Sequence, residues 1–282
     1  MDKIRFKGVS CIWRFHSYFV QRILRIIRNS SLQLGSPNNC NIFRLIMCGR
    51  SSLTKTEKEL EDRFQASFYS EDLERYNPLP NFNVAPTHVM PVISNQDPTH
   101  FRPMRWGLIP FWAKDHKVGY KMINARIETV EDKTFGAALE KRRCLVPFDG
   151  FYEWKTSGKK KKPYRIVVEH GKLFAIAGLW EKWKSPNGEL IESFTLITQP
   201  ANHMMSSIHD RMPAILLPGQ ERLWIDPALS GKEALQLIIP YPDDEMSAYP
   251  VSDRVGKVTE NDAGLIEEYD EPEQNAQLDL FS

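Results

Sequence analysis

Residues 164–180, YRIVVEHGKLFAIAGLW, contain two runs of the kind found in β-strands. Tyr164–Val168 and Phe174–Trp180 are rich in β-branched and aromatic residues, and the polar segment Glu169–Lys172 between them includes a glycine. This pattern is typical of two strands joined by a short loop. The stretch therefore predicts a hairpin, and with it a fold in which strands dominate.

Further strands and short helices are predicted on both sides of this stretch. A helix over roughly 55–66 is indicated by two overlapping capping boxes in Thr54–Glu59 and by the apolar pair Leu60 and Phe64. Additional strands are expected at 121–126, 194–198 and 213–217, and short helices near 133–141, 202–208, 219–225 and 231–238. Because strands and helices do not alternate regularly, we expect an α+β fold with an antiparallel, barrel-like β core and flanking short helices.

Composition fits one globular domain with tails. The chain has 282 residues, of which 41% are hydrophobic and 11% aromatic, enough to bury a core of one domain of about 200 to 250 residues. Residues 1–46 hold eight basic side chains and one acidic, whereas residues 259–282 hold eight acidic and none basic. The middle is nearly neutral, so nucleic-acid binding would require a local basic surface.

Several classes of protein are disfavoured. Apolar runs are shorter than the ~20 residues that span a bilayer, and Arg22, Arg25 and Arg28 interrupt the amino-terminal candidate. No secretory signal is recognised, although an arginine-rich start is also compatible with a mitochondrial presequence. The four cysteines contain no C-x-x-C pair, so neither a metal site nor a disulfide framework is indicated. We expect a cytoplasmic protein without cofactor or membrane segment.

A change in composition at Met47 marks the expected start of the domain. Residues 1–46 show no coherent helix or strand pattern and end in a Ser/Asn/Pro-rich stretch. They are therefore expected to be a leader outside the domain. The domain is expected over 47–258, followed by an acidic, disordered tail over 259–282.

Cys48, in Met47-Cys48-Gly49-Arg50, is the first candidate reactive residue. A single cysteine is more often a small buried side chain than a nucleophile. If translation starts at Met47 and that methionine is removed, Cys48 carries a free α-amine beside its thiol. Such a 1,2-aminothiol condenses with an aldehyde as an imine and then closes to a thiazolidine, and an α-amine of pKa about 7.7 to 8 needs little activation.

Three further segments offer polar side chains for chemistry. Asn124 and Arg126 share one face of a predicted strand. In the functional interpretation, the Asn124 amide positions a substrate oxygen and the Arg126 guanidinium binds a phosphate. The alternative is a polar strand face without such a role. Glu153 lies among aromatic residues, where burial would make it a proton shuttle; the alternative is an edge-strand carboxylate facing water. His209 is predicted between a helix and a strand, as a catalytic or a structural histidine.

Two features suit nucleic-acid contact. Trp106–Trp112 is aromatic and stiffened by a proline, as a base-stacking surface would be, although core filling would look the same. The lysines at 159–162 are expected in a solvated hairpin loop, with phosphate contact as the alternative.

Several ordered blocks together resemble the SOS response-associated peptidase (SRAP), or abasic-site processing, family. The blocks are Met47–Arg50, Phe82–Thr87, Arg105–Pro110, Ile123–Thr129, Arg143–Pro147, Gly150–Trp154 and Ile208–Pro213. The resemblance covers roughly 47–256. It implies a single domain with a twisted, barrel-like β core and a basic groove for single-stranded DNA.

The resemblance also implies residue roles. Cys48 would form a thiazolidine cross-link with the ring-opened abasic sugar, assisted by Asn124, Glu153 and His209, with His209 also serving the slow, lyase-like reversal. The residues implied to line the DNA path are Arg50, Asn83, Pro86, Trp112, Arg126, Trp154 and Arg211. The function implied is an abasic-site sensor that shields damaged DNA in the SOS response.

The 46 residues before Met47 depart from the family, which normally begins at its Met-Cys. With them attached, Cys48 has no α-amine, so we expect a misassigned start or proteolytic removal. The alternative functions are a cysteine peptidase (hydrolase), including autoproteolysis that exposes Cys48, and a non-catalytic single-strand binder or replication adaptor.

The acidic tail ends in Gln277, Leu278, Asp279, Leu280 and Phe281. This pentapeptide resembles the bacterial sliding-clamp-binding motif, which implies tethering at replication forks in the nucleoid; the alternative is a tail that merely ends in apolar residues.

Overall fold

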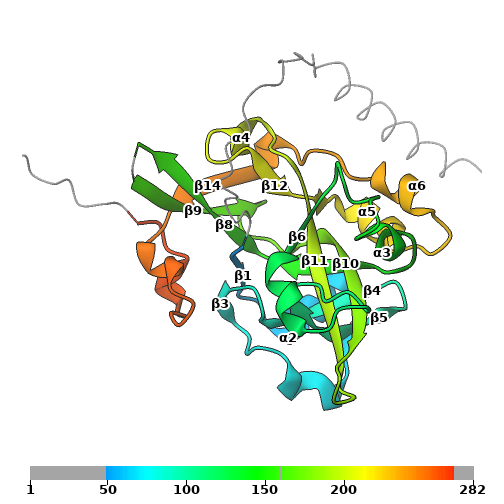
Figure 1. The fold of residues 1–282 in the computed structure, drawn as a ribbon. Coiled ribbons are helices and arrows are strands. Elements are labelled where there is room, and N and C mark those ends of the chain that lie inside the picture. The colour runs from blue at the N-terminus through cyan, green and yellow to red at the C-terminus, as the bar shows by residue number, and fades with distance from the viewer. Residues whose placement is uncertain (1–48, 159, 270–282) are drawn as a thin grey trace, which may run out of the picture. The chain divides into compact units, whose positions relative to one another are not determined.

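The computed structural model describes residues 49–158 and 160–269, which form two β-sheets with short helices at their margins (Figure 1). Cys48 and the tail from residue 270 onward, with its motif at 277–281, lie outside the described residues. The mixture of strands and short helices confirms the predicted α+β fold with a barrel-like β core.

The smaller sheet has five antiparallel strands. In spatial order they are β14 (Met246–Pro250), β9 (Lys160–Val168), β8 (Gly150–Ser157), β1 (Ser51–Leu53) and β3 (Asn81–Val84). Strand β8 therefore lies inside the sheet, between the amino-terminal strand β1 and β9. This sheet brings the start of the domain next to a strand about one hundred residues later.

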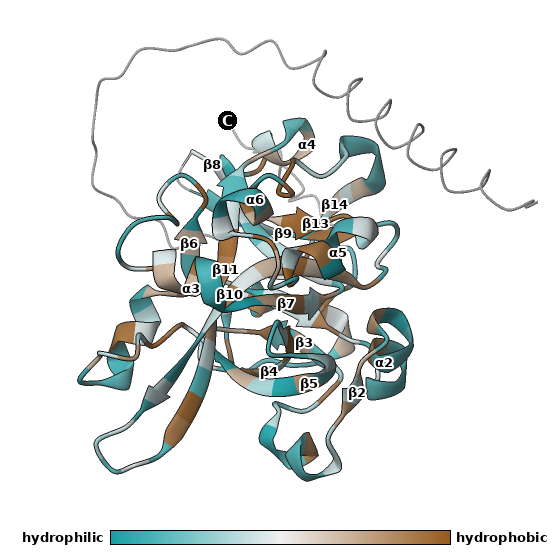
Figure 2. Ribbon diagram, turned by 90° about the vertical axis from the view of Figure 1, so that its right-hand side faces the viewer, coloured by the Kyte–Doolittle hydropathy of each residue, from teal (hydrophilic) through white to brown (hydrophobic). Residues whose placement is uncertain are grey.

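The larger sheet has nine strands. Its main path is β12 (Arg211–Pro213), β11 (Leu190–Pro200), β10 (Phe174–Lys184), β7 (Arg143–Phe148), β4 (Val89–Ser94), β5 (Asp97–Trp106) and β2 (Ser67–Phe68). Two further strands join it, β13 (Ile215–Leu216) beside β10 and β6 (Asn124–Arg126) parallel to β11. Apolar residues concentrate in the central strands, including β7 and β10 (Figure 2).

The predicted hairpin over 164–180 is wrong, although both of its strands exist. Strand β9 pairs with β8 and β14, whereas β10 pairs with β7, β11 and β13. Glu169, His170 and Gly171 adopt positive φ angles of 42°, 62° and 85°, so the chain turns sharply at this point. The segment thus carries the chain from one sheet to the other instead of pairing its flanks.

The predicted helices are confirmed as short elements. They are α2 (Glu57–Phe64), α3 (Gly136–Lys141), α4 (His203–Ser206), α5 (Pro218–Trp224) and α6 (Gly231–Leu235). Of the two candidate capping boxes, the structure uses Thr56 with Glu59: the Thr56 side chain accepts from the Glu59 amide, and the Glu59 carboxylate accepts from the Thr56 amide. Leu60 and Phe64 are the buried residues of α2, as expected.

The chain between β5 and β6 differs from the expected strand at 121–126. Residues His116–Lys121 form the 3₁₀ helix η2, and strand β6 begins only at Asn124. Gly107 (φ 115°) and Gly119 lie so close that a Cβ on either would come within 2.7 Å of the carbonyl oxygen of the other. Two glycines are needed at this crossing, which fixes η2 against the end of β5.

Folded structure continues past residue 258, where the sequence analysis ends the domain. Two 3₁₀ helices, η4 (Asp253–Gly256) and η5 (Ala263–Leu265), follow β14. Two others lie earlier in the chain: η3 (Asp243–Glu245) precedes β14, and η1 (Ser70–Arg75) follows β2. Leu265 is fully buried, and the Tyr249 hydroxyl donates to the Ile266 carbonyl over 3.0 Å. Residues 259–269 are therefore part of the fold and not of a disordered tail.

Within residues 49–158 and 160–269, no helix is long and apolar enough to cross a bilayer.

Candidate functional site

The described chain begins at Gly49, immediately after Cys48. Strand β1 pairs with β8 so that Ser51 lies opposite Phe151, and the Tyr152 amide donates to the Arg50 carbonyl over 2.9 Å. These contacts place the start of the described chain beside Phe151 and Tyr152 of β8, the strand that also carries Glu153, the candidate proton shuttle.

Glu153 is almost fully buried, with 3% of its surface exposed. It lies on the interior strand β8, opposite Tyr164 of β9, so the alternative of an edge-strand carboxylate facing water is wrong. A carboxyl group in such surroundings is shielded from bulk water and is suited to proton transfer.

A buried polar network holds β1 in its register. Asp149, 1% exposed, accepts hydrogen bonds from the Ser52 hydroxyl (2.6 Å), the Thr54 amide (2.6 Å) and the Thr54 hydroxyl (2.5 Å). Arg165 of β9 donates to the same carboxylate over 3.2 Å and to the Tyr249 hydroxyl over 2.7 Å. Through Asp149, in the bend before β8, these contacts tie β1 to β9 and β14 of the small sheet, which fixes where the chain enters the site.

Arg50 and Asn83 form a clamp on the carboxyl-terminal segment. The Arg50 guanidinium donates to Asn83 Oδ1 (3.0 Å) and to the carbonyls of Val255 (2.5 Å) and Gly256 (3.1 Å), and partial burial lowers its pKa. The Asn83 amide donates to the carbonyls of Lys257 and Glu260, both over 2.9 Å, and the residue is 1% exposed.

Arg50 and Asn83, expected on the DNA path, both contribute to this clamp, and their contact with DNA stays a prediction. Their polar atoms are occupied by backbone carbonyls, and Asn83 has almost no surface to offer. In this structure they position the chain on either side of β1 rather than presenting free donors.

A second group of candidate residues surrounds β11. Asn124 and Arg126 of β6 lie opposite Leu196 and Thr198 of β11, while Ala125 between them is buried. Asn124 and Arg126 therefore share one face of β6, as the sequence predicts; Arg126 is exposed, whereas Asn124 is half-buried and its Oδ1 is buried. Arg126 is exposed and, among the described residues, forms no ion pair, so its guanidinium is available for a phosphate.

Arg211 is placed differently from Arg126. It is 8% exposed and donates from both terminal nitrogens to Glu128, over 2.9 Å at Oε2, and to the Thr198 carbonyl over 2.8 Å. Burial alone would raise the pKa of Glu128, but the hydrogen bonds from Arg211 and the charges of Arg211 and Arg126 lower it. Arg211 is therefore a largely buried partner of Glu128, and its place on the DNA path stays a prediction.

Glu128 is the residue that sequence reasoning missed. It lies two positions after Arg126 in the block Ile123–Thr129, so its charge, opposite to those around it, was the available signal. Its carboxylate determines which of the two arginines stays free.

His209 lies between α4 and β12, as predicted, and its side chain is 13% exposed. Its Nδ1 accepts from the Arg211 amide over 3.1 Å. Asp210 Oδ1 lies 2.9 Å from the same nitrogen, a hydrogen bond only when Nδ1 carries a proton. Because the Asp210 side chain is 86% exposed and the amide is fixed, we assign the amide contact to the neutral ring, which leaves Nε2–H as the proton donor.

Two aromatic rings stand exposed on an anchored turn. Phe111 and Trp112 are 65% and 60% exposed, and the turn is closed by the Ala113 amide donating to the Pro110 carbonyl over 2.9 Å. Trp183 Nε1 donates to the Ala113 carbonyl over 2.6 Å, which fixes the base of the turn. Trp106 is instead fully buried, so the first part of the segment Trp106–Trp112 fills the core and its end is an exposed aromatic surface suited to stacking. Of the two exposed rings, only Trp112 was expected from the sequence to contact DNA.

The remaining candidates have intermediate exposure. Trp154 packs beside the buried cluster of Tyr152, Val251, Val255 and Leu265, while Pro86 lies in the turn before β4. Trp154 thus supports the clamp region from β8.

The candidate residues fall into two groups, one on each sheet. Across the residues that the structure describes, no group of three or more His, Cys, Asp or Glu side chains is arranged to hold a metal ion. The arrangement offers a buried acid beside the amino-terminal strand, a histidine with one nitrogen committed, a free arginine and exposed aromatic rings. These are the parts needed for proton transfer near a polyanion.

Comparison with known proteins identifies relatives of the whole domain. The sequence model described as SOS response associated peptidase (SRAP) matches residues 47–258. The abasic site processing protein YoqW of Bacillus subtilis is 41% identical over 227 residues, covering 79% of this chain and 100% of the relative. The abasic site processing protein YedK of Escherichia coli is 32% identical over 230 residues, covering 78% and 99%.

A solved structure has the same fold. The crystal structure of a protein from Bacteroides thetaiotaomicron superimposes with a TM-score of 0.73 at 28% sequence identity, covering 79% of this chain and all of that one.

Proposed function

This chain belongs to the SOS response associated peptidase (SRAP) family, and from that premise we propose that it binds single-stranded DNA at abasic sites and links itself to them covalently through Cys48. The relatives named abasic site processing proteins support the substrate class. The observation that carries the proposal is the pairing of β1 with β8: the Tyr152 amide, one residue before the buried Glu153, donates to the carbonyl of Arg50, two residues after Cys48.

The chemistry requires an amino-terminal cysteine. The α-amine of Cys48 adds to the C1′ aldehyde of the ring-opened abasic sugar and, with loss of one water, gives an imine. The thiol sulfur then adds to the imine carbon while a proton reaches the nitrogen, which closes a thiazolidine. A free α-amine has a pKa of about 7.7 to 8 and is partly neutral near pH 7, so it attacks without strong activation.

The described side chains supply the proton transfers. Glu153 is shielded from bulk water and takes and returns protons as the imine forms and closes. His209 Nε2 serves sugar ring opening and reversal of the link. Asn124 positions the sugar and the amine, and Arg126 with the rings of Phe111 and Trp112 holds the strand.

The experiment compares protein that begins at Cys48 with protein that carries one additional residue before it. Each is incubated with single-stranded oligonucleotide containing one abasic site and separated under denaturing conditions. We expect a stoichiometric adduct only from the first protein, and none from its Cys48→Ala variant, because only a free α-amine can close the ring. An equal adduct from the extended protein would rule out the thiazolidine.

The carboxyl-terminal motif at residues 277–281 supports a further proposal, tethering to a bacterial sliding clamp at replication forks. The motif lies outside the described residues. A short tether raises the effective concentration of the domain near template DNA without tight intrinsic affinity. Binding of a peptide covering 270–282 to purified clamp tests it, with the triple variant Gln277→Ala, Leu280→Ala and Phe281→Ala as control; equal signals from both peptides would reject the tether.

A further inference from the structure

Four lysines gather where the hairpin of β8 and β9 extends beyond β14. Lys160, Lys161 and Lys162 belong to strand β9 rather than to the solvated loop that the sequence suggests, and Lys155 belongs to β8. The last residue pair between β9 and β14 is Tyr164 with Pro250, so this end of the hairpin continues past its neighbour (Figure 1).

The register places most of these lysines on the face that carries Glu153. Glu153 lies opposite Tyr164, Lys155 opposite Lys162, and Ser157 opposite Lys160. Side chains alternate between faces along a strand, so these three pairs share one face and follow one another at steps of about 6.6 Å. A row of cations therefore leads outward from the proposed proton shuttle along a single face of the hairpin.

The arrangement is unfavourable for the isolated protein. Lys155 directly faces Lys162, and like charges opposite one another on neighbouring strands destabilise a sheet. Elsewhere Lys58, Lys172 and Lys182 each pair with a carboxylate. Among the residues described by the structure, none of the four lysines on the hairpin forms an ion pair.

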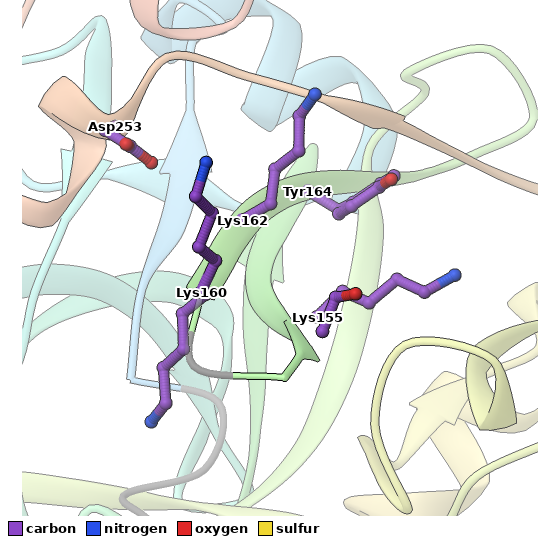
Figure 3. A pocket seen from close by; sticks show the side chains of 7 residues that line it. Lys155, Lys160, Lys162, Tyr164 and Asp253 are labelled. Carbon is purple, nitrogen blue, oxygen red and sulfur yellow. The ribbon is translucent and has the colours of Figure 1, made fainter.

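The lysines line an open hollow of about 560 Å³ together with Ser157, Tyr164 and Asp253 (Figure 3). Asp253 is the single acid in this lining, which leaves a net charge of +3. The labelled ammonium groups of Lys155, Lys160 and Lys162 point in different directions and do not converge on one position (Figure 3). Dispersed cations suit an extended polyanion better than one small anion.

We propose that this face of the β8–β9 hairpin is a second nucleic-acid contact, which takes backbone phosphates of the nucleotides that flank the abasic position. The ligand chemistry is the phosphodiester backbone, from either the continuing single strand or a duplex flank. The inference rests on the proposed DNA binding but not on the cross-link, since it requires no reaction at Cys48.

The test is the salt dependence of DNA binding by the triple variant Lys155→Gln, Lys160→Gln and Lys162→Gln. Each phosphate contact on a single strand contributes about 0.7 to the slope of log K against log salt, so losing three lowers the slope by about 2 and the affinity at 0.1 M salt by about 100-fold. The matched control, Lys133→Gln, Lys141→Gln and Lys232→Gln, removes the same charge from exposed positions next to or on α3 and α6, far from the hairpin in Figure 1.

Ligand length and form separate the outcomes. We expect the loss with 20-nucleotide strands and a smaller loss with four-nucleotide strands, which have fewer phosphates to place against the three lysines. A loss confined to strands with a duplex flank identifies the duplex as the source of the phosphates. An unchanged slope, or an equal decrease in the α3 and α6 control, overturns the proposal. The thermal midpoint of the triple variant should not fall, because removing the Lys155 and Lys162 repulsion does not weaken the sheet.

The same proteins distinguish this inference from the proposed function. Suppose that the parent gives no denaturation-resistant adduct with abasic DNA, yet the salt dependence of DNA binding is weaker in the triple variant than in the parent. The proposed cross-link is then rejected and the hairpin contact is supported. If adducts form on four-nucleotide strands in both proteins but the slopes agree, the hairpin contact fails and the cross-link stands.

Discussion

Arg165 donates a hydrogen bond to Asp149 over 3.2 Å, and both side chains are nearly inaccessible to water, at 6% and 1% exposure. The same carboxylate accepts from Ser52 and Thr54, so the ion pair holds the strand that follows Arg50. An unpaired buried charge is costly, and the position of β1 depends on avoiding one.

Asp149→Asn is therefore expected to lower the free energy of unfolding by about 3 to 5 kcal/mol, because it leaves the Arg165 cation buried without its partner. Urea unfolding measures this, with the exposed Asp244→Asn as a control expected to stay within about 0.5 kcal/mol. Combining Asp149→Asn with Arg165→Met should cost less than the two single changes added together. Additive costs would show that the two charges do not interact.

Arg126 and Arg211 are expected to respond in opposite ways. Arg126→Ala should lower the salt slope of single-strand binding by about 0.7, with stability nearly unchanged, because its guanidinium is exposed and unpaired among the described residues. Arg211→Ala should lower stability by about 1 to 3 kcal/mol, since it removes the donors to Glu128 and to the Thr198 carbonyl. Parallel unfolding and anisotropy titrations decide this, and the reverse pattern would contradict the assignment.

A third prediction concerns the exposed aromatic rings of Phe111 and Trp112. Phe111→Ala and Trp112→Ala should each weaken single-strand binding by about 1 to 3 kcal/mol, through loss of base stacking. The turn is held by Pro110 and Trp183, so stability should change little. Leu223→Ala on α5, 45% exposed, serves as the matched loss of apolar surface. If Leu223→Ala weakens binding as much as Trp112→Ala does, the rings are not a stacking surface.

His209 gives a fourth prediction, measured on release and not on binding. His209→Gln should slow the return of DNA from a preformed adduct at least tenfold, because loss of a general acid or base typically costs about 10²-fold or more. Equilibrium binding of intact single strands should be unchanged. Parental release kinetics in the variant would remove His209 from the mechanism.

The stability of the protein should depend on pH through His88. Burial, and secondarily the positive charge of Arg50, lower the pKa of His88 below its ordinary 6.5. The folded state then binds a proton less readily than the unfolded chain, so stability is complete above pH 6.5 and falls as pH decreases from 6.5 to the folded pKa. His88→Gln should flatten this part of the pH profile of unfolding. A profile that is identical in the variant would assign the dependence to other groups.

Local sequence patterns predicted the positions of helices and strands better than they predicted which strands pair with one another. The capping residues Thr56 and Glu59 act within one turn, so the start of α2 could be predicted from neighbouring residues alone. The pairing of β9 and β10 could not, because their partners are strands elsewhere in the chain: β9 pairs with β8 and β14, and β10 with β7, β11 and β13.

The candidate site shows the same division. The aromatic residues around Glu153, which are sequence neighbours, raised burial as one of two alternatives, and the structure shows that the residue is buried. The sequence did not predict which arginines are bound to acceptors within the protein and which are free. The acceptors of Arg50 are carbonyls at 255 and 256, and the partner of Arg211 lies 83 residues earlier. Identical side chains acquired different roles from tertiary contacts that no local pattern contains.

The contact of Arg50 with the Val255 carbonyl spans 205 positions of the chain. Ribosomes deliver proteins from the amino terminus onward, so the partner of Arg50 emerges only near the end of synthesis. Strand β8 is synthesised earlier, so β1 can gain its sheet partner while it still lacks the clamp. The amino-terminal end of the domain is therefore the part of the fold that is completed last, and an enzyme that acts on a nascent amino terminus would meet it before the clamp has closed.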